Sequence, residues 1–310
     1  MKILFMGTPD FAVFSLDALV RSGEEIIGVV TQPDKPKGRG YALTPPPVKS
    51  YALDKGIPVY QPNTLRDDAF AELLAGLDPE LIVVVAYGKI LPKNVLDYPK
   101  YKCVNVHGSL LPEYRGAAPM QRAIIDGKKT TGITTMYMDV GLDTGNMILK
   151  DEVEIGENDN FEDIHDKLGL CGAELLIKTI NEIKEGRAPS IPQDDSLATY
   201  AAKIEKTDCL IDFNKNSQTV HDLIRGLSPI PIAFTHTPDG KLLKVLESRR
   251  YDRSYEAEAG TVVSTDNGEI TVACGNGSVG LLRVLPEGKG RMSSADFIRG
   301  RKISVGDILK

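Results

Sequence analysis

The first half of the chain alternates short runs of β-branched and aliphatic residues with stretches whose apolar residues recur at helical spacing. This alternation is typical of a parallel sheet covered by helices, because a crossover between parallel strands needs a helix-sized connection. Thr8 and Pro9 fit a helix start, with threonine as the N-cap and proline at the first helical position. We therefore expect an α/β domain with a Rossmann-like, mostly parallel sheet whose strands are Lys2–Met6, Glu25–Thr31, Ile57–Tyr60, Leu81–Ala86, Cys103–His107 and Ile133–Met138.

The turn after the first predicted strand has only Gly7, so it lacks the glycine-rich cradle that binds the phosphates of a dinucleotide or a nucleoside triphosphate. In open sheets of this kind the ligand binds beyond the carboxyl ends of the strands. The sequence therefore directs attention to the residues just after Ala86, Val106 and Met138.

The second half of the chain has a different pattern. A helix is predicted over Phe161–Lys184, and Gly186 is a suitable residue to end it. Further on, a helix near Ser217–Arg225 leads into short alternating strands separated by glycine-bearing turns, which predicts a small OB-like β-barrel. The expected organisation is an α/β catalytic domain (1–186), a polar linker with prolines (187–206) and a carboxy-terminal β-barrel domain (207–310).

Composition limits the class of protein further. In 310 residues with a net charge of −6, the N-terminal run is too short for a signal peptide, and no apolar stretch approaches the ~18 to 20 residues of a membrane span. The four cysteines are scattered, which favours buried thiols over disulfides or zinc. We expect a cytoplasmic protein, and because nothing in the sequence demands an oligomer, we expect a monomer.

Three polar residues form the candidate reaction centre. Asn105 and His107 stand two apart at the end of a predicted strand, so their side chains point to the same face. Asp143 lies in a glycine-bounded loop after another strand, and we expect that loop to carry it to the same edge of the sheet. An amide and an imidazole can stabilise the oxyanion of acyl transfer to an amine. A carboxylate can hold the imidazole in one tautomer, favour its protonated form, or take a proton from the amine through water.

Each of these residues also fits a structural role when it is taken singly. A histidine at a strand end is often a plain hydrogen-bonding group, and the L-D-T-G segment is equally typical of a simple turn. The sequence has no H-x-x-x-H pair and no cysteine partner for His107, so we expect no metal in the active site.

Longer motifs surround these residues. The segment N-V-H-G-S-L-L-P-E-Y-R-G-A-A-P (105–119), together with G-L-D-T-G (141–145), closely resembles the folate-dependent formyltransferases. The opening F-M-G-T-P-D-F-A (5–12), T-Q-P-D-K-P-K-G-R-G (31–40) and V-A-Y-G-K-I-L-P (85–92) are similar to the branch of that family that formylates methionine on initiator tRNA. The resemblance covers essentially the whole chain.

The resemblance implies 10-formyltetrahydrofolate as the formyl donor and initiator methionyl-tRNA as the acceptor. It also implies that Asn105, His107 and Asp143 are the catalytic group. The implied folate-binding residues lie in three short segments; they are Ser109, Leu110, Leu111, Pro112, Tyr87, Gly88, Asp139 and Gly141. Leu110 and Leu111 offer apolar surface for a pterin ring, although a plain loop anchored in the core would show the same pattern.

Two basic segments suggest contact with RNA. The segment 33–47 is longer than a usual connection and carries Lys35, Lys37 and Arg39; in the resembled family the matching loop inserts at the tRNA acceptor end. The segment 283–302 has a local excess of positive charge, which is also typical of a solvated face. Its basic residues are a possible second tRNA contact and comprise Arg283, Lys289, Arg291, Arg299, Arg301 and Lys302.

Other functions fit parts of this pattern. A formyltransferase for a small amine, such as glycinamide ribonucleotide or an amino-sugar nucleotide, or a formyl-folate hydrolase, would share the Asn105, His107 and Asp143 group. Such enzymes would lack the basic loop and the carboxy-terminal barrel. A non-catalytic RNA-binding module is less consistent with the acidic net charge and the intact reaction centre.

Overall fold

The computed structural model describes residues 1–37 and 42–310, and it divides into two compact units that are interleaved along the chain. The first unit comprises residues 1–116, 131–154 and 165–200, and the second comprises residues 117–130, 155–164 and 201–310. Arg39 lies outside the described residues.

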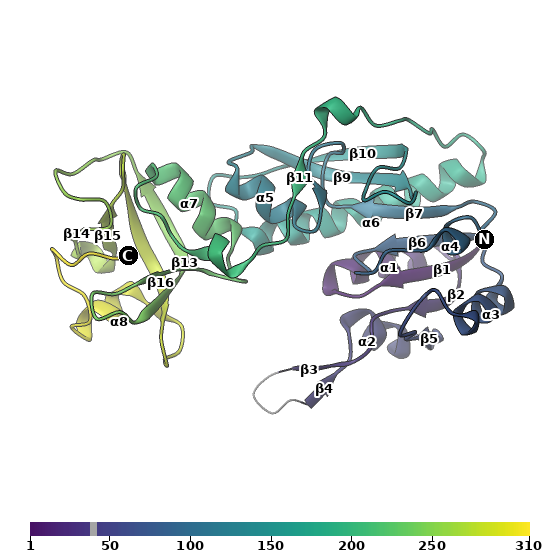
Figure 1. Cartoon of the computed structure of the whole chain (residues 1–310), viewed down its shortest axis with the longest axis horizontal. Coiled ribbons are helices and arrows are strands. Elements are labelled where there is room, and N and C mark those ends of the chain that lie inside the picture. Colours follow the sequence, from purple (N-terminus) through teal and green to yellow (C-terminus); the bar gives the residue numbers. More distant parts are fainter. Residues whose placement is uncertain (38–41) are drawn as a thin grey trace. The chain divides into compact units, whose positions relative to one another are not determined.

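The first unit is built on a seven-stranded sheet with the order β10-β9-β7-β6-β1-β2-β5, which Figure 1 shows from β10 to β2. Neighbouring strands from β5 to β7 are parallel, whereas β9 runs antiparallel to β7. The predicted mostly parallel sheet is confirmed. Its strands are β1 (Lys2–Gly7), β2 (Glu25–Val30), β5 (Val59–Tyr60), β6 (Leu81–Val85), β7 (Cys103–His107), β9 (Thr130–Tyr137) and β10 (Met147–Glu154).

Helices cover the sheet because its strands are apolar on both faces. On one face, alternate strand residues such as Leu4 and Ile82 pack with Phe70 and Leu74. On the other face, Val106 of β7 lies under the long helix that contains Gly172. The helices that include residues of this unit are α1 (Asp10–Arg21), α2 (Pro47–Asp54), α3 (Asp68–Leu77), α4 (Lys93–Leu96) and α6 (Phe161–Lys184).

Two local predictions for the first unit were wrong. Helix α1 begins one residue later than expected: Pro9 is its N-cap, while the Thr8 hydroxyl donates instead to the carbonyl of Tyr87, at 3.0 Å. The segment 33–47, expected as a long loop with no strand among those predicted, contains a hairpin of β3 (Lys35–Lys37) and β4 (Ala42–Thr44). Hydrogen bonds between β3 and β4 satisfy backbone N–H and C=O groups of this segment, for which the sequence pattern indicated no partner.

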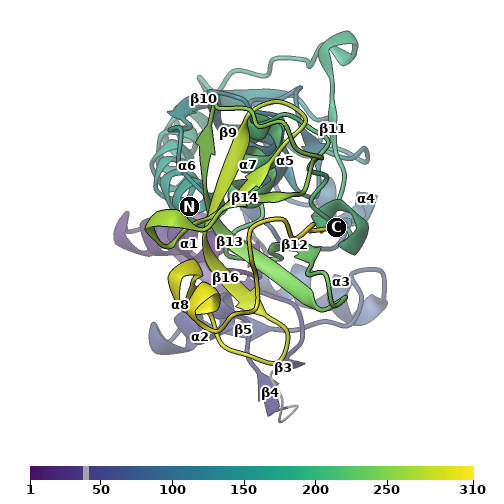
Figure 2. The ribbon, with the colours of Figure 1, turned by 90° about the vertical axis from the view of Figure 1, so that its left-hand side faces the viewer.

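The second unit is an antiparallel sheet with the order β12-β13-β16-β15-β14, and β17 pairs with β16. Figure 2 shows its long strands β13 and β16. Two short strands, β8 (Arg115–Gly116) and β11 (Tyr200–Ala201), lie near the unit boundaries. The α-helices of the second unit and the strands of its sheet are α5 (Pro119–Ile125), α7 (Ser217–Gly226), β12 (Ala233–His236), β13 (Leu242–Tyr251), β14 (Val262–Ser264), β15 (Ile270–Ala273), β16 (Ser278–Pro286), β17 (Met292–Ser293) and α8 (Ser294–Arg299).

The segment 306–310 closes this sheet toward a barrel. On one side, the Leu309 amide donates to the carbonyl of Gly260, next to β14; on the other, His236 of β12 and Lys310 exchange two backbone hydrogen bonds. Figure 2 marks the chain end beside β12. Gly260 has a φ of +89°, and a Cβ there would lie 2.5 Å from the Leu309 carbonyl, so only glycine allows this approach. The predicted barrel-like domain is confirmed.

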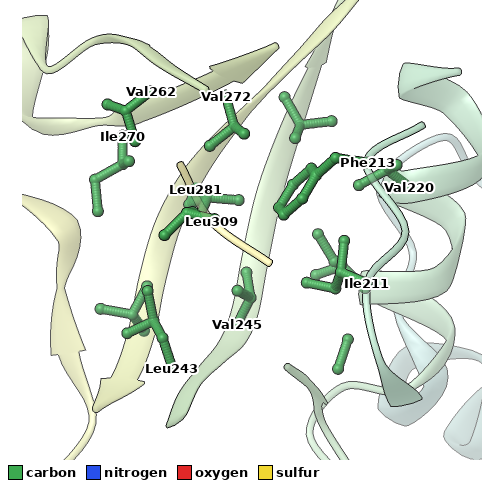
Figure 3. Close-up of a cluster of buried hydrophobic side chains, with 14 of the residues drawn as sticks. Ile211, Phe213, Val220, Leu243, Val245, Val262, Ile270, Val272, Leu281 and Leu309 are labelled. Atoms are coloured by element: carbon green, nitrogen blue, oxygen red, sulfur yellow. The ribbon is translucent and has the colours of Figure 1, made fainter. Parts of the chain in front are cut away.

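A separate hydrophobic core fills the second unit. Figure 3 shows its side chains converging from α7, the sheet and the closing segment 306–310. Val220 comes from α7, Leu281 from β16 and Leu309 from the closing segment, and each is at most 2% exposed. Since both units have their own core, each has the main requirement for an independently stable fold.

Candidate active site

Strand β7 places Asn105 and His107 on one face of the first unit's sheet. Side chains alternate along the strand: Val106 faces α6, so Asn105 and His107 face the opposite side. Asn105 is 9% exposed and His107 is 6% exposed. The side-chain amide of Asn105 has no hydrogen bond to any group within residues 1–37 and 42–310. It is therefore available to a ligand carbonyl.

The two nitrogens of His107 face different partners. Nε2 lies 3.0 Å from the carbonyl oxygen of Tyr114, which can only accept, so Nε2 carries a proton. Nδ1 lies 3.7 Å from Oδ2 of Asp143, too far for a hydrogen bond but close enough for electrostatic attraction. When Nδ1 also carries a proton, the imidazolium and the carboxylate form a nearly buried ion pair.

Asp143 reaches His107 by a different route from the one expected. Because β9 is antiparallel to β7, Met138 lies at the amino end of β7, where its amide donates to the carbonyl of Cys103. The prediction that residues after Met138 begin at the same sheet edge as those after Val106 was therefore wrong. The loop instead turns back, and its Asp143 carboxylate accepts from the Gly116 amide at 2.8 Å as well as facing His107.

Internal contacts fix the 138–146 loop. The Asp139 carboxylate accepts from the Gly141 amide at 2.9 Å and from the Thr144 hydroxyl at 2.7 Å. A Cβ at Gly145 would lie 1.7 Å from the Tyr137 carbonyl, so any other residue there would push the loop off the strand. Asp139 and Gly141, predicted to bind folate, thus both shape the loop that carries Asp143.

The turn 109–114 is held by residues that sequence reasoning missed. Thr134 of β9 donates to the Ser109 carbonyl and accepts from the Leu111 amide, and the Lys150 ammonium donates to the Leu111 carbonyl. Burial lowers the pKa of Lys150. No local pattern marks Thr134 or Lys150, because each meets the turn only through strand pairing.

The residues predicted to line a folate site differ in how deeply they are buried. Ser109 and Leu111 are fully buried, Leu111 packing with Met136 and Met147, while Leu110 and Pro112 are half-buried. Leu111 therefore anchors the turn in the core, the alternative that the sequence left open for this pair of leucines.

The segment after β6 also approaches the site face through its backbone. Tyr87 is 2% exposed, and burial raises its pKa to about 12. Its carbonyl accepts from Thr8 and from the Gln32 side chain, and Gly88 follows with a φ of +86°. Nearby in the sequence, Ile90 is 73% exposed, which leaves an apolar side chain for a ligand.

The predicted RNA-contacting side chains are exposed wherever the structure describes them. Lys35 of β3 is exposed, whereas the side chain of Lys37 is outside the described part. In the second unit Arg299 pairs with Asp296 on α8. The exposed basic residues of that segment are Arg283, Lys289, Arg291, Arg299, Arg301 and Lys302.

Chemically, the site offers an amide, an imidazole and a carboxylate on one face of a rigid sheet, which suits acyl transfer. In the part of the chain that the structure describes, no cluster of three His, Cys, Asp or Glu side chains is arranged to bind a metal. The helices described there also include none long and apolar enough to cross a membrane.

Comparison with known proteins identifies the family to which this fold belongs. The formyl transferase family model matches residues 1–180, and the model of the formyl transferase C-terminal domain matches residues 203–302. An N-formyltransferase from Helicobacter canadensis, solved in complex with folinic acid and dTDP-3-aminofucose, has a TM-score of 0.69 and covers 91% of this chain and 98% of its own. Its sequence identity is 21%, so this likeness shows the fold alone.

Sequence relatives are closer. The methionyl-tRNA formyltransferase of Bacillus velezensis is 49% identical over 309 residues, which are 99% of this chain and 97% of the relative. The methionyl-tRNA formyltransferase of Clostridium novyi is 47% identical over the full length of both chains. The chain therefore belongs to the formyl transferase family, among the methionyl-tRNA formyltransferases, and the resemblance seen in the sequence is confirmed.

Proposed function

We propose that this protein transfers the formyl group of 10-formyltetrahydrofolate to the amino group of methionine on initiator tRNA, giving N-formylmethionyl-tRNA for translation initiation. The observation that carries the proposal is near-full-length identity of 47–49% with proteins named methionyl-tRNA formyltransferase. The meeting of His107 and Asp143 supports it independently, because the fold brings these side chains together from strand β7 and from a separate loop. We also propose that the protein is a monomer and that it acts in the cytoplasm, where initiator tRNA is charged.

The reaction joins the amine nitrogen to the formyl carbon and breaks the bond between that carbon and N10 of the folate. Attack places negative charge on the formyl oxygen, and the Asn105 amide is a free donor for it. His107, with Asp143 beside Nδ1, can donate to the same oxygen or pass the proton lost by the amine to N10. Tyr114 keeps the ring oriented through its carbonyl.

The folate is proposed to bind against three segments of the first unit. Ser109–Pro112 would line the site, and Tyr87–Gly88, Asp139 and Gly141 would present backbone groups to the pterin. Exposed apolar side chains in or beside two of these segments supply contact area for a flat ring. These side chains are Ile90, Val140 and Leu142, which are 73%, 72% and 53% exposed.

The tRNA is proposed to contact the segment 33–47, with Lys35, Lys37 and Arg39, and the basic segment of the second unit. Phosphate contacts by exposed arginine and lysine provide most of the attraction between proteins and nucleic acids. Because the net charge of the whole chain is −6, the attraction must be local to these segments.

An acceptor assay tests the proposal. The protein is incubated with 10-formyltetrahydrofolate and, in separate reactions, methionylated initiator tRNA, an amino-sugar nucleotide, glycinamide ribonucleotide or buffer alone. We expect formylmethionine on the tRNA, detected by mass spectrometry, and little transfer elsewhere. Formylation of a small amine but not of the tRNA would overturn the proposed acceptor, and formate release without any acceptor would indicate a hydrolase. The His107→Ala variant gives the background rate.

A further inference from the structure

The segment 190–200, predicted as part of a linker, lies against the candidate active site. Ile191 exchanges two backbone hydrogen bonds with Met147, where β10 begins, at 2.8 and 2.9 Å. Thr199 donates from its amide to the Pro112 carbonyl and accepts the Arg115 amide at its carbonyl. Both ends of the segment are therefore bound to the first unit, and Gln193, between them, faces the loop of Asp143.

Gln193 bonds directly to the backbone of that loop. Its side-chain nitrogen donates to the carbonyls of Asp143, at 2.7 Å, and Gly145, at 2.8 Å. Its side-chain oxygen accepts from Nε of Arg115 at 3.0 Å, which fixes which end of the amide faces the loop. Arg115 is itself largely buried and also pairs with the exposed Asp195.

These contacts join the two halves of the reaction centre. Arg115 directly follows Tyr114, whose carbonyl orients His107, and the Tyr114 amide is held by the Thr199 hydroxyl at 2.8 Å. On the other side, Gln193 holds the backbone of Asp143. The pair of Arg115 and Gln193 thus spans from the turn behind the imidazole to the loop that carries the carboxylate.

The backbone of Asp143 needs such support. Its φ is +54°, a left-handed conformation that most residues with a side chain avoid. Two hydrogen bonds to the carbonyls of Asp143 and Gly145 resist relaxation of the loop toward ordinary φ values. Such a relaxation would rotate the carboxylate away from Nδ1 of His107, and a displacement of about 1 Å at a reacting group can reduce a rate ~10²-fold.

We infer that Gln193, oriented by Arg115, is a positioning residue that sets the place of Asp143 relative to His107. The inference rests on the proposed function, since it assigns Gln193 to that same reaction centre. Gln193 touches no reacting atom in this arrangement; it acts through the backbone of Asp143. It follows that the segment 190–200 is part of the active site's framework.

The Gln193→Leu variant tests this inference, because leucine has a similar size but no donor. We expect kcat for methionyl-tRNA formylation to fall ~10- to 100-fold, with KM for the folate and for the tRNA within about threefold of wild type. The ¹⁵N signals of the His107 ring should also shift, since its charged neighbour has moved. As a matched control, Gln218→Leu on α7 of the second unit should keep the wild-type kcat and the wild-type His107 signals.

Other outcomes would overturn the inference. If Gln193→Leu keeps the wild-type kcat, or if kcat falls only in proportion to the folded fraction while the His107 signals stay in place, Gln193 is merely structural. Should this variant fail to fold, Arg115→Lys, which removes the Nε donor, is expected to give the same loss of kcat and the same shift of the His107 signals. An Arg115→Lys variant with unchanged kcat and unchanged His107 signals would also overturn the inference. A wild-type protein without formyl transfer would instead contradict the proposed function.

Discussion

At the scale of single residues, the His107 ring lies between the neutral carbonyl oxygen of Tyr114 and the charged carboxylate of Asp143. Its Nε2 proton is committed to the Tyr114 carbonyl, so only Nδ1 can change its protonation without breaking that bond. Asp143 sits beside Nδ1 and is anchored by the Gly116 amide, which leaves the carboxylate little freedom to move. Charge on Asp143 therefore matters at the step where the imidazole becomes cationic.

The Asp143→Asn variant separates this charge from the shape of the side chain. Asparagine keeps an oxygen that can accept from Gly116, so we expect the fold and tRNA binding to persist. Without the negative charge, the imidazolium loses its stabilising partner, and kcat should fall at least ~10²-fold. Steady-state kinetics with methionyl-tRNA, together with a thermal melt, measure both effects. A variant that turns over at nearly the wild-type rate would remove Asp143 from the catalytic group.

At the scale of elements, α7 buries a polar cluster that binds the segment 155–164 within the second unit. Arg225 is 4% exposed; it pairs with Asp222 at 2.7 Å and donates to the carbonyls of Gly156 and Asp159. One turn earlier, His221 bonds to the Ser248 hydroxyl and to the Glu157 carbonyl. A buried ion pair contributes little by itself, but loss of one partner typically costs ~3–5 kcal/mol, so the cluster fixes this segment in one position.

His221 should make the stability of the second unit depend on pH. Burial, the largest cause, lowers its pKa below the value of 6.5 that it has when unfolded, despite the nearby carboxylate of Asp222. Below about pH 6.5 the unfolded chain therefore binds a proton that the folded chain does not. The free energy of unfolding should fall with decreasing pH through this range, by up to ~1.4 kcal/mol per pH unit, until the folded pKa is reached.

Denaturant unfolding of wild type and His221→Gln between pH 5 and 8 checks this expectation. Glutamine can still donate to the Glu157 carbonyl but does not titrate, so the variant should lose part of the slope below pH 6.5 even if it is less stable overall. Equal slopes for the two proteins would show that His221 does not link folding to protons.

At the scale of the whole molecule, what the sequence predicted follows from the range of the interactions. The β-rich runs and the i, i+2 spacing of Asn105 and His107 are local patterns. The runs predicted the strands correctly, and the spacing correctly predicted that both side chains lie on one face of the sheet. The direction of β9 is set by pairing with distant residues. The route predicted for the Asp143 loop was therefore wrong, although the Asp143 carboxylate does reach His107. Gln193 lies 50 residues from Asp143, and no periodicity in the sequence encodes that contact. Arg39, outside the described residues, stays a prediction.

The closure of the barrel gives the last expectation, because a five-residue segment joins two edge strands. Leu309 is 2% exposed in the second unit's core, and its amide bonds to Gly260. Leu309→Ala should therefore cost ~2–5 kcal/mol of that unit's stability, which speeds amide hydrogen exchange in β12, β14 and β15 by ~30-fold or more.

Amides of β6 and β7 should be unaffected by Leu309→Ala, because the first unit has its own core. Val305→Ala, at a residue 61% exposed in the same tail, is the matched control and should leave exchange unchanged in both units. Equal acceleration in β7 and β14 would mean that the two units unfold as one cooperative body. No acceleration in β14 would mean that the segment 306–310 does not hold the barrel closed.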